Sequence, residues 1–187
     1  MRIITGKAKG VRLETLEGEA TRPTAERVKE AVFSMLQFDI EGRRVLDLFA
    51  GSGQMGLEAL SRGAREAVMV DKSKQAVAII NKNVAKTKFV AESRVFCADY
   101  ADYIRRFGGE KFDIVFLDPP YAAGLYAPAL LALLDAGMLK STTIIVCESD
   151  TDEIFEKNEA LKERFSEVKV SRYSRTVITL LSPLAEV

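Results

Sequence analysis

Four consecutive residues of this sequence combine a carboxylate, two prolines and an aromatic ring: Asp118, Pro119, Pro120 and Tyr121. They follow the apolar run of residues 112–117, which predicts a buried strand. Proline has no N–H to donate and fixes φ, and the residue before a proline is pushed toward extended conformations. We therefore expect Asp118 and Pro119 to be held rigidly, with side-chain and backbone oxygens free as acceptors. Two acceptors and a ring can hold a planar amino group by its two N–H bonds and stack on the base that carries it.

A second candidate site is the glycine-rich loop that follows the apolar run of residues 44–49. Gly51, Gly53 and Gly56 have the G-x-G-x-x-G spacing and stand between a predicted strand and a predicted helix. Glycine at these positions lets the backbone approach a nucleotide-like ligand closely. Asp71 ends the next apolar run, at the distance from the loop at which an acidic residue binds ribose hydroxyls. This pattern fits a dinucleotide site.

Asp47, inside the strand just before the glycines, favours a different ligand. An anion there disfavours a pyrophosphate and suits the ammonium group of a methionine moiety. The pattern Asp-x-Phe-x-Gly-x-Gly resembles the S-adenosylmethionine loop of class I methyltransferases. Residues 118–121 resemble the Asp/Asn-Pro-Pro-Tyr/Phe motif of methyltransferases that act on exocyclic or amide nitrogens. That motif is short, and by itself it also fits a Pro-Pro turn that closes a strand.

A third polar strand end is Asp99, which with Tyr100 follows the apolar run of residues 95–98. In the class I pattern a carboxylate here lies at the amino edge of adenine, and the same side chain can cap the next helix. We expect one cleft formed by the loops after the first four strands, because ligands bind at the carboxyl ends of strands in such sheets. The predicted catalytic residues are Asp118, Pro119, Pro120 and Tyr121. The predicted cofactor-binding residues are Asp47, Phe49, Ala50, Gly51, Ser52, Gly53, Asp71, Lys72, Asp99, Tyr100 and Asp118.

The composition excludes several other kinds of chemistry. The 187 residues contain no histidine, and the cysteines are Cys97 and Cys147, both in apolar runs. Histidine-based acid–base catalysis, serine–histidine and cysteine–histidine nucleophiles and histidine-ligated metals are therefore excluded. We expect two reduced core thiols and no metal. No apolar run has transmembrane length, and the N-terminal apolar stretch is too short for a signal peptide, so we expect a cytoplasmic protein that does not contact a membrane.

Basic residues are concentrated at the two ends of the chain, although the formal net charge is zero. Residues 1–13 and 168–185 contain lysine and arginine and no acidic residue, whereas residues 150–167 are acidic overall. Gly6 and Gly10 bracket lysines in a predicted hairpin. The two ends could form a phosphate-facing surface, or carry ordinary solvated side chains. The predicted RNA-binding residues are Arg2, Lys7, Lys9, Arg12, Arg22, Arg172 and Arg175.

Predicted strands and helices alternate through most of the chain, and the last two strands, residues 167–172 and 176–181, form a hairpin. This order predicts an α/β fold: a parallel sheet with helices on both faces and an antiparallel strand inserted near one edge. The predicted fifth strand, residues 142–147, ends at Glu148, to which the sequence assigns no role. A charged, solvent-facing helix is predicted over residues 150–164.

The whole chain resembles the bacterial RsmD-like family, which methylates the N2 amine of a guanine in small-subunit (16S) ribosomal RNA. The matching stretches come in the family's order, and the N-terminal signature separates this family from other Pro-Pro methyltransferases. Gln54 and Met55 depart from the small apolar pair that is usual at the start of this helix. The stretches that carry the resemblance are Arg2-Ile3-Ile4-x-Gly6, Lys9-Gly10, Arg22-Pro23-Thr24, Arg27-Val28 and residues 47–53, 56–64 and 118–121.

The resemblance implies a seven-stranded class I S-adenosylmethionine-dependent methyltransferase fold, which is Rossmann-like. It implies a domain over residues 21–187 and an N-terminal basic β-hairpin extension over residues 1–20. The cofactor would be S-adenosylmethionine, with S-adenosylhomocysteine as product. Ribosomal RNA or the small ribosomal subunit particle would be the partner, with no obligate protein partner. We expect no separate target-recognition domain, so substrate choice would rest on the hairpin and surface loops.

Four other functions compete with this one. A DNA or RNA adenine-N6 methyltransferase shares the tetrapeptide, although the DNA enzymes usually carry a recognition domain. A protein glutamine-N5 methyltransferase also shares it, with Asn more often in place of Asp118. A nicotinamide-dependent oxidoreductase would explain the glycines and Asp71, but neither Asp47 nor the two prolines. A non-enzymatic RNA-binding module would explain the basic ends and leave two ligand motifs without a purpose.

Overall fold

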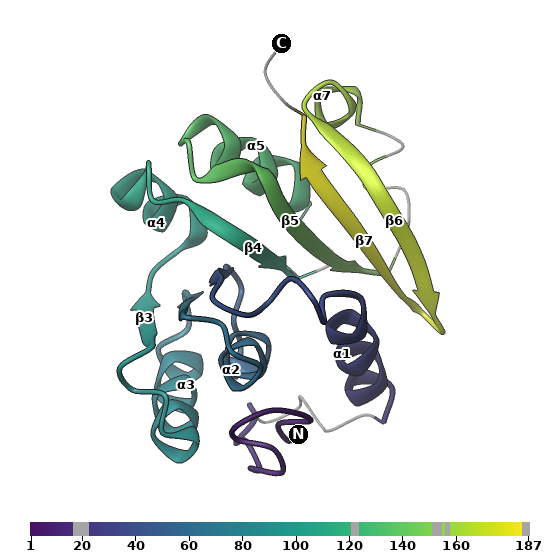
Figure 1. Ribbon diagram of the computed structural model, residues 1–187. Coiled ribbons are helices and arrows are strands. Elements are labelled where there is room, and N and C mark those ends of the chain that lie inside the picture. The colour runs from purple at the N-terminus through teal and green to yellow at the C-terminus, as the bar shows by residue number, and fades with distance from the viewer. Residues whose placement is uncertain (17–22, 121–123, 151–154, 156–157, 185–187) are drawn as a thin grey trace.

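Figure 1 shows the computed structural model of the protein, which describes residues 1–16, 23–120, 124–150, 155 and 158–184. The described residues form one seven-stranded sheet in the order β3-β2-β1-β4-β5-β7-β6. Strands β1 to β5 run parallel, and β7 is antiparallel to its neighbours β5 and β6. The predicted class I sheet, with its antiparallel strand near one edge, is thereby confirmed. The strands are β1 (Arg44–Asp47), β2 (Glu66–Asp71), β3 (Ser93–Cys97), β4 (Phe112–Leu117), β5 (Leu139–Ser149), β6 (Phe165–Tyr173) and β7 (Thr176–Pro183).

Helices cover both faces of this sheet (Figure 1). Two of them begin at side chains that satisfy free backbone N–H groups: Ser73 Oγ accepts from Ala76 N at 3.3 Å, and Asp99 Oδ1 accepts from Ala101 N at 2.9 Å. Ser73 lies just after β2, which ends at Asp71, and Asp99 lies just after β3, which ends at Cys97, so each helix begins after a very short connection. The helices are α1 (Pro23–Met35), α2 (Gln54–Ser61), α3 (Lys74–Thr87), α4 (Tyr100–Phe107), α5 (Tyr126–Asp135) and α7 (Glu159–Lys162).

The apolar strands divide the core into two layers, one on each face of the sheet. Successive side chains of a strand point to opposite faces. Val45 and Phe116 accordingly pack with α1, α2 and α3, whereas their neighbours Leu46 and Leu117 pack with α4, α5 and α7. Because both faces are buried, the central strands are continuous apolar runs, and a polar residue such as Asp47 in one of them needs a specific explanation.

Residues 1–13 pack into the first of these layers. Ile3 and Leu13 are buried there. Arg2 and Arg12 form an isolated antiparallel bridge, so the two arms of the segment pair over a shorter length than a regular two-stranded ladder. The segment therefore shares the core of the rest of the chain.

Glu58 of α2 holds this N-terminal segment through a buried carboxylate. Its oxygens accept from the backbone N–H groups of Ile4 at 2.8 Å and Thr5 at 3.0 Å. Arg62 Nε lies 2.9 Å and Lys29 Nζ lies 3.4 Å from the same carboxylate. A buried charge is tolerated when its lone pairs are occupied by opposite charges and hydrogen-bond donors. The N-terminal segment thus supplies part of what allows this glutamate to be buried.

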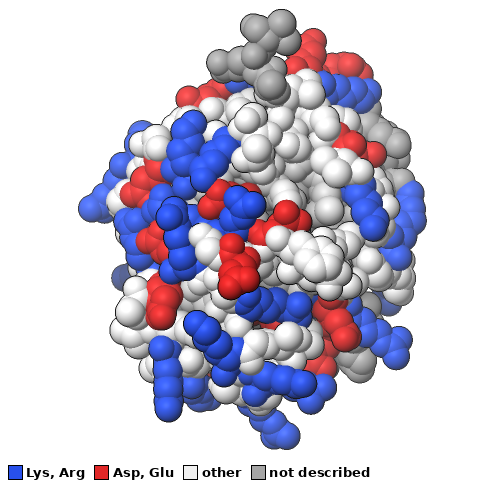
Figure 2. Space-filling model, viewed as in Figure 1, with Lys and Arg blue, Asp and Glu red and all other residues white. Residues whose placement is uncertain are grey.

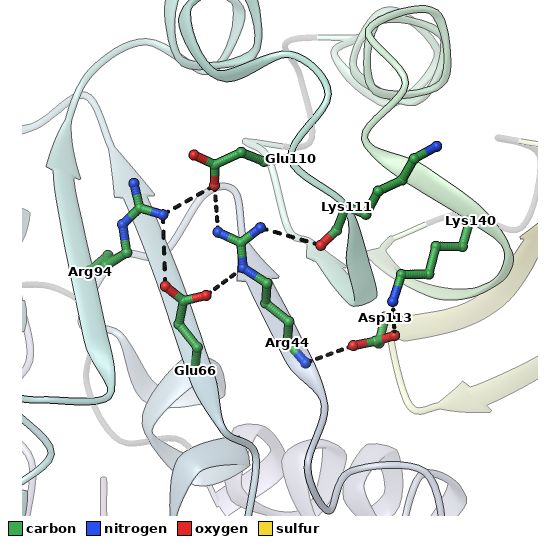
Figure 3. Close-up of polar contacts among 7 residues, drawn as sticks. All are labelled: Arg44, Glu66, Arg94, Glu110, Lys111, Asp113 and Lys140. Atoms are coloured by element: carbon green, nitrogen blue, oxygen red, sulfur yellow. Dashed lines mark hydrogen bonds and ion pairs between the residues drawn. The ribbon is translucent and has the colours of Figure 1, made fainter.

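The amino-terminal ends of the parallel strands are tied together by a polar network (Figure 3). Arg44 at the start of β1 pairs with Glu66 and Glu110 and lies 4.5 Å from the ring centroid of Phe112. Its backbone N–H donates to Asp113 Oδ2 at 2.8 Å. The amino-terminal ends of these strands are therefore occupied by ion pairs. A ligand site in this sheet is expected at the carboxyl-terminal ends of the strands.

Some predicted boundaries differ from the observed ones. The predicted charged helix of residues 150–164 is represented by α7, Glu159–Lys162, and its residues 151–154 and 156–157 lie outside the described part of the chain. Within α7, Leu161 is fully buried, so this short helix faces the core as well as solvent. None of the helices in the described residues has the length and apolar character needed to span a membrane.

Candidate active site

A cavity of about 560 Å³ opens at the carboxyl-terminal edge of the parallel strands. Its walls come mainly from the carboxyl ends of β1 to β5 and the residues that follow them, as expected for ligand sites in sheets of this kind. The N-terminal segment and α1 also contribute to the walls. Of the predicted site residues, twelve line it: Asp47, Phe49, Ala50, Gly51, Ser52, Asp71, Lys72, Asp99, Tyr100, Asp118, Pro119 and Pro120. Tyr121 and Arg22 lie outside the described residues.

The glycine loop between β1 and α2 is shaped by hydrogen bonds to β2. Gly51 has φ +53° and donates its N–H to Asp71 Oδ2 at 2.9 Å. Gly53 has φ +76°, and a Cβ atom there would stand 3.1 Å from Met69 Sδ and 3.2 Å from Ile80 Cγ2. Gly53 does not line the cavity, so its role is to let the loop turn tightly against the core while Gly51 and Ser52 face the cavity.

Asp47 is a carboxylate buried at the end of β1, where it lines the cavity and is 4% exposed. Burial raises its pKa to about 7, the hydrogen bond from Gly56 N at 3.2 Å opposes this, and the charge of Asp71 adds to it. A cation bound nearby would favour the ionised form and lower the pKa again. The site is therefore suited to an ammonium group and unsuited to a phosphate.

Asp71 at the end of β2 is oriented by two backbone donors. Its Oδ1 accepts from Ser73 N at 2.8 Å, and its Oδ2 accepts from Gly51 N. A carboxylate has about four lone-pair sites, so both oxygens retain capacity for hydroxyl donors. This is the arrangement that a ribose diol requires, and Lys72 lies beside it on the cavity wall.

Asp99 and Tyr100 form the next part of the wall, after β3. Asp99 caps α4 through Oδ1 and also lines the cavity, so the helix cap leaves this residue at the cavity wall. The rings of Phe49 and Tyr100 lie 5.5 Å apart between centroids, tilted by 42°. Two aromatic rings beside a carboxylate provide the apolar surface and the acceptor that a purine with an exocyclic amine needs.

Gln54 gives a separate indication that a polar ligand belongs here. It opens α2, it lines the cavity, and its buried Oε1 atom has no hydrogen-bond partner among the described residues. Buried polar atoms are nearly always paired, so an unpaired one at a cavity wall marks a place where a ligand donor fits. Together with Asp47, Asp71 and Asp99, this residue fits the ammonium, ribose and adenine groups of S-adenosylmethionine.

The other end of the cavity lies over β4 and β5. Asp118, Pro119 and Pro120 line it directly after the buried end of β4. Apolar side chains form the surrounding wall: Val32 of α1, Phe116, Val146 and Ile178. This end combines polar acceptors with apolar walls of a size that suits an aromatic ring.

Two charged cavity residues were missed by sequence reasoning. Lys29 is 2% exposed, although it sits beside the apolar stripe of α1, and its Nζ donates to the Arg2 carbonyl oxygen at 2.6 Å. Burial lowers its pKa, while the nearby Glu58 carboxylate opposes that shift. Glu148, at the end of β5, also lines the cavity. The sequence signal for Glu148 was its place at a strand end, the same signal that identified Asp71 and Asp99.

The basic residues predicted to contact RNA fall into two groups. Arg2, Lys7, Lys9 and Arg12 are exposed on the N-terminal segment, and Arg2 Nε lies 3.3 Å from Glu26 of α1. Figure 2 shows Lys and Arg side chains gathered along the lower part of the molecule, where Figure 1 places this segment. Arg172 and Arg175 are exposed at the β6–β7 turn.

Helix α1 contacts both of these groups. At its start it meets the N-terminal segment through Arg2, and at its end Met35 Sδ lies 3.9 Å from Ser171 Oγ of β6. One helix therefore contacts both of the segments that carry these basic residues, and it also lines the cavity through Val32.

Comparisons with known proteins agree with this arrangement. The family model described as Conserved hypothetical protein 95 matches residues 1–182. Ribosomal RNA small subunit methyltransferase D of Haemophilus influenzae is 36% identical over 154 residues, covering 81% of this chain and 80% of that protein. The protein of the same name from Escherichia coli (strain K12) is 35% identical over 152 residues, covering 81% of this chain and 76% of that protein.

The solved structures agree as well. The Escherichia coli protein yhhF, described as a candidate methyltransferase, superimposes with a TM-score of 0.85 at 30% identity, over 100% of this chain and 99% of that one. Fold, site and sequence relatives point to the same assignment. The chain therefore belongs to the Conserved hypothetical protein 95 family, which is the RsmD-like family that its motifs resemble.

Proposed function

We propose that this protein transfers the methyl group of S-adenosylmethionine to the exocyclic N2 amine of a guanine in small-subunit ribosomal RNA. The main support is that one cavity joins the acidic strand ends Asp47, Asp71 and Asp99 to the acceptors at Asp118 and Pro119. The relatives named ribosomal RNA small subunit methyltransferase D support the substrate class. An RNA substrate of this kind would place the activity in the cytoplasm.

The residues at the β4 end would activate a weak nucleophile. The lone pair of an exocyclic amine is delocalised into its ring. Asp118 Oδ and the Pro119 carbonyl oxygen would accept the two amine hydrogens and favour the pyramidal geometry in which the lone pair points out of the ring. These oxygens would also stabilise the positive charge that grows on nitrogen as the C–N bond forms.

The residues at the β1 to β3 end would bind and orient the methyl donor. S-adenosylmethionine, when bound, supplies a methyl group on a sulfonium, which needs no metal. Asp47 and Gln54 would hold the methionine end, Asp71 the ribose and Asp99 the adenine, with Lys72 and the loop residues Phe49 to Gly53 completing the wall. Holding both reactants in one cavity supplies much of the acceleration, because it fixes the line of approach.

Proton removal requires no strong base in this scheme. The methylated ammonium is acidic enough to lose its proton after transfer, and the chain has no histidine that could act beforehand. A guanine in folded RNA must leave its stack to enter the cavity, at a cost of a few kcal/mol. Tyr121 would stack on the flipped base. Exposed basic side chains on the N-terminal segment and the β6–β7 turn would hold flanking phosphates.

The test is transfer of label from S-adenosylmethionine to small-subunit ribosomal RNA, given free and in particles that lack the modification, followed by nucleoside analysis. We expect label in N2-methylguanosine. Label in N6-methyladenosine would be consistent with the proposed cofactor and acceptor pair, but it would contradict the N2 amine of guanine as the target. Absence of label in RNA, in a preparation that binds S-adenosylhomocysteine, would contradict the RNA substrate.

A further inference from the structure

We propose that Glu148 reads the target base by accepting the N1–H of guanine beside Asp118, an inference that rests on the proposed function. Glu148 would thus be the residue that makes the cavity selective for guanine over adenine. It would act on the same base edge as the acceptors for the amine and would take no part in methyl transfer itself.

The sheet register places Glu148 next to Asp118. Strands β4 and β5 are parallel, and Leu117 is paired with Cys147. The residues that follow this pair are Asp118, directly after the end of β4, and Glu148, within β5. Paired positions of neighbouring strands lie about 4.8 Å apart and point to the same face. Both residues line the same cavity. The two side chains therefore lie on one wall of the cavity, from which their oxygens could converge on two adjacent donors of one base edge.

The backbone of Glu148 is fixed independently of its carboxylate. The hydroxyl of Tyr126 donates to the Glu148 backbone carbonyl oxygen, and Glu148 is paired with Ile178 of β7. No ion pair or hydrogen bond within the described part of the chain engages the carboxylate itself. The backbone of Glu148 is thus held in place, and its carboxylate lies at the cavity wall, where it can accept a hydrogen bond from a ligand.

The environment of the carboxylate favours a ligand donor. Val146 and Ile178 flank it with apolar surface on the cavity wall. Burial raises the pKa of Glu148, so a hydrogen-bond partner for its carboxylate would stabilise the ionised form. An N–H donor presented at this place would supply one.

The chemistry of the two candidate bases then decides the selectivity. Guanine presents an N1–H and a 2-amino group side by side, so adjacent acceptors at Glu148 and Asp118 match it. Adenine presents a lone pair at N1 beside its 6-amino group, and a carboxylate facing that lone pair repels it. Sites built to accept a substrate N–H reject the analogue that lacks it much more strongly than apolar pockets reject a change of shape.

The test compares two bases at the target position in two proteins. The methylated nucleotide is first mapped in particles treated with the wild-type protein. Ribosomal RNA is then made by splinted ligation with either guanosine or 2-aminopurine riboside there. 2-Aminopurine keeps the 2-amino group and has a lone pair in place of the N1–H. The measured quantity is the guanosine to 2-aminopurine ratio of kcat/KM for wild type and for Glu148→Gln.

We expect the wild-type ratio to exceed the Glu148→Gln ratio by about tenfold or more, because an amide can donate to the N1 lone pair that the carboxylate repels. The intrinsic reactivity of the bases cancels in this comparison. Glu167→Gln, the same substitution on exposed β6, should keep the wild-type ratio. S-adenosylhomocysteine affinity should be unchanged in both variants, which shows that they are folded.

Equal ratios in wild type and Glu148→Gln would overturn the inference and leave the proposed function standing. Failure of the wild-type protein to produce N2-methylguanosine during the mapping would overturn the proposed function, and this inference with it. The two failures are therefore distinguished before the variant is measured.

Discussion

Gly6 of the N-terminal segment lies so close to Ser61 of α2 that a Cβ atom on it would stand 1.7 Å from the Ser61 carbonyl oxygen. The contact is reinforced by hydrogen bonds on either side, from Lys7 N to Ser61 O at 2.8 Å and from Ser61 Oγ to Thr5 O at 2.6 Å. The N-terminal segment therefore packs against α2, the helix that follows the glycine loop.

Replacing Gly6 by alanine should undock this segment. The new Cβ meets backbone that cannot move away, and φ is +87°, so we expect a loss of more than ~3 kcal/mol in the free energy of unfolding. Gly10→Ala is the control, because its φ is +85° but no atom lies within 4 Å of the added carbon. It should cost only about 1–2 kcal/mol of backbone strain. Urea unfolding measures both, and equal losses would show that the contact with Ser61 does not matter.

Asn83 of α3 connects the glycine loop, through Ser52, to Glu14, which follows the N-terminal segment. Its fully buried amide accepts from Glu14 N at 2.7 Å and donates to Glu14 O and Ser52 O, each at 2.9 Å. Asn83→Ala should cost roughly 2–4 kcal/mol, because it leaves these buried groups unpaired. It should also weaken S-adenosylhomocysteine binding measured by calorimetry. Asn81→Ala, exposed on the same helix, is the control and should change neither quantity.

Asp47 should make stability depend on pH in an unusual direction. Its pKa in the folded protein is about 7, against an ordinary value of 3.8, chiefly because of burial. The folded state therefore holds an extra proton between these values, so this residue lowers stability as pH rises through that window. Asp47→Asn should remove the effect and raise the free energy of unfolding above about pH 7 by up to ~4 kcal/mol.

The same residue should couple cofactor binding to proton release. An ammonium group favours the ionised form of Asp47, so affinity for S-adenosylhomocysteine should rise as pH increases toward about 7 and then level off. Asp47→Asn should bind more weakly and lose that pH dependence. Asp102→Asn, an exposed carboxylate on α4, should behave as wild type in both assays. A wild-type affinity that does not change over this pH range would contradict the role given to Asp47.

The exposed lysines of the N-terminal segment should contribute to RNA affinity through phosphate contacts. Replacing Lys7 and Lys9 by glutamine should weaken binding to small-subunit ribosomal RNA and reduce the slope of log affinity against log salt by about 0.7–0.9 per lost contact. Filter binding over a range of salt concentrations measures this. Glutamine at Lys111 and Lys162, before β4 and on α7, is the control. A wild-type affinity that is insensitive to salt would remove this surface from the account.

The sequence brought the acidic residues of the candidate site together because the relevant signals are local. An apolar run that ends in a polar residue identifies a strand end, and sheets of this type bring such ends together. Asp71, Asp99 and Asp118 were identified in this way, and Asp47 was identified by its place just before the glycine loop. All four line the cavity. Asp99 was also predicted correctly as the cap of the following helix.

The features that sequence reasoning missed depend on contacts between distant parts of the chain. Gly6 was assigned to a turn, but its tightest constraint is Ser61, which no local pattern indicates. Lys29 is buried because Glu58 and the Arg2 carbonyl surround it. The role proposed for Glu148 depends on the register between β4 and β5, which only the assembled sheet defines.

The most direct test uses Asp118 to distinguish the two functions proposed for the cavity, which are cofactor binding at one end and activation of the amine at the other. Methyl transfer to small-subunit particles and S-adenosylhomocysteine binding are measured side by side in wild type and Asp118→Ala. The account predicts that transfer falls by about a thousandfold or more while cofactor affinity stays within about threefold, since Asp118 acts mainly on the amine. Loss of cofactor affinity in parallel with transfer, in a variant that unfolds at the wild-type urea concentration, would contradict it.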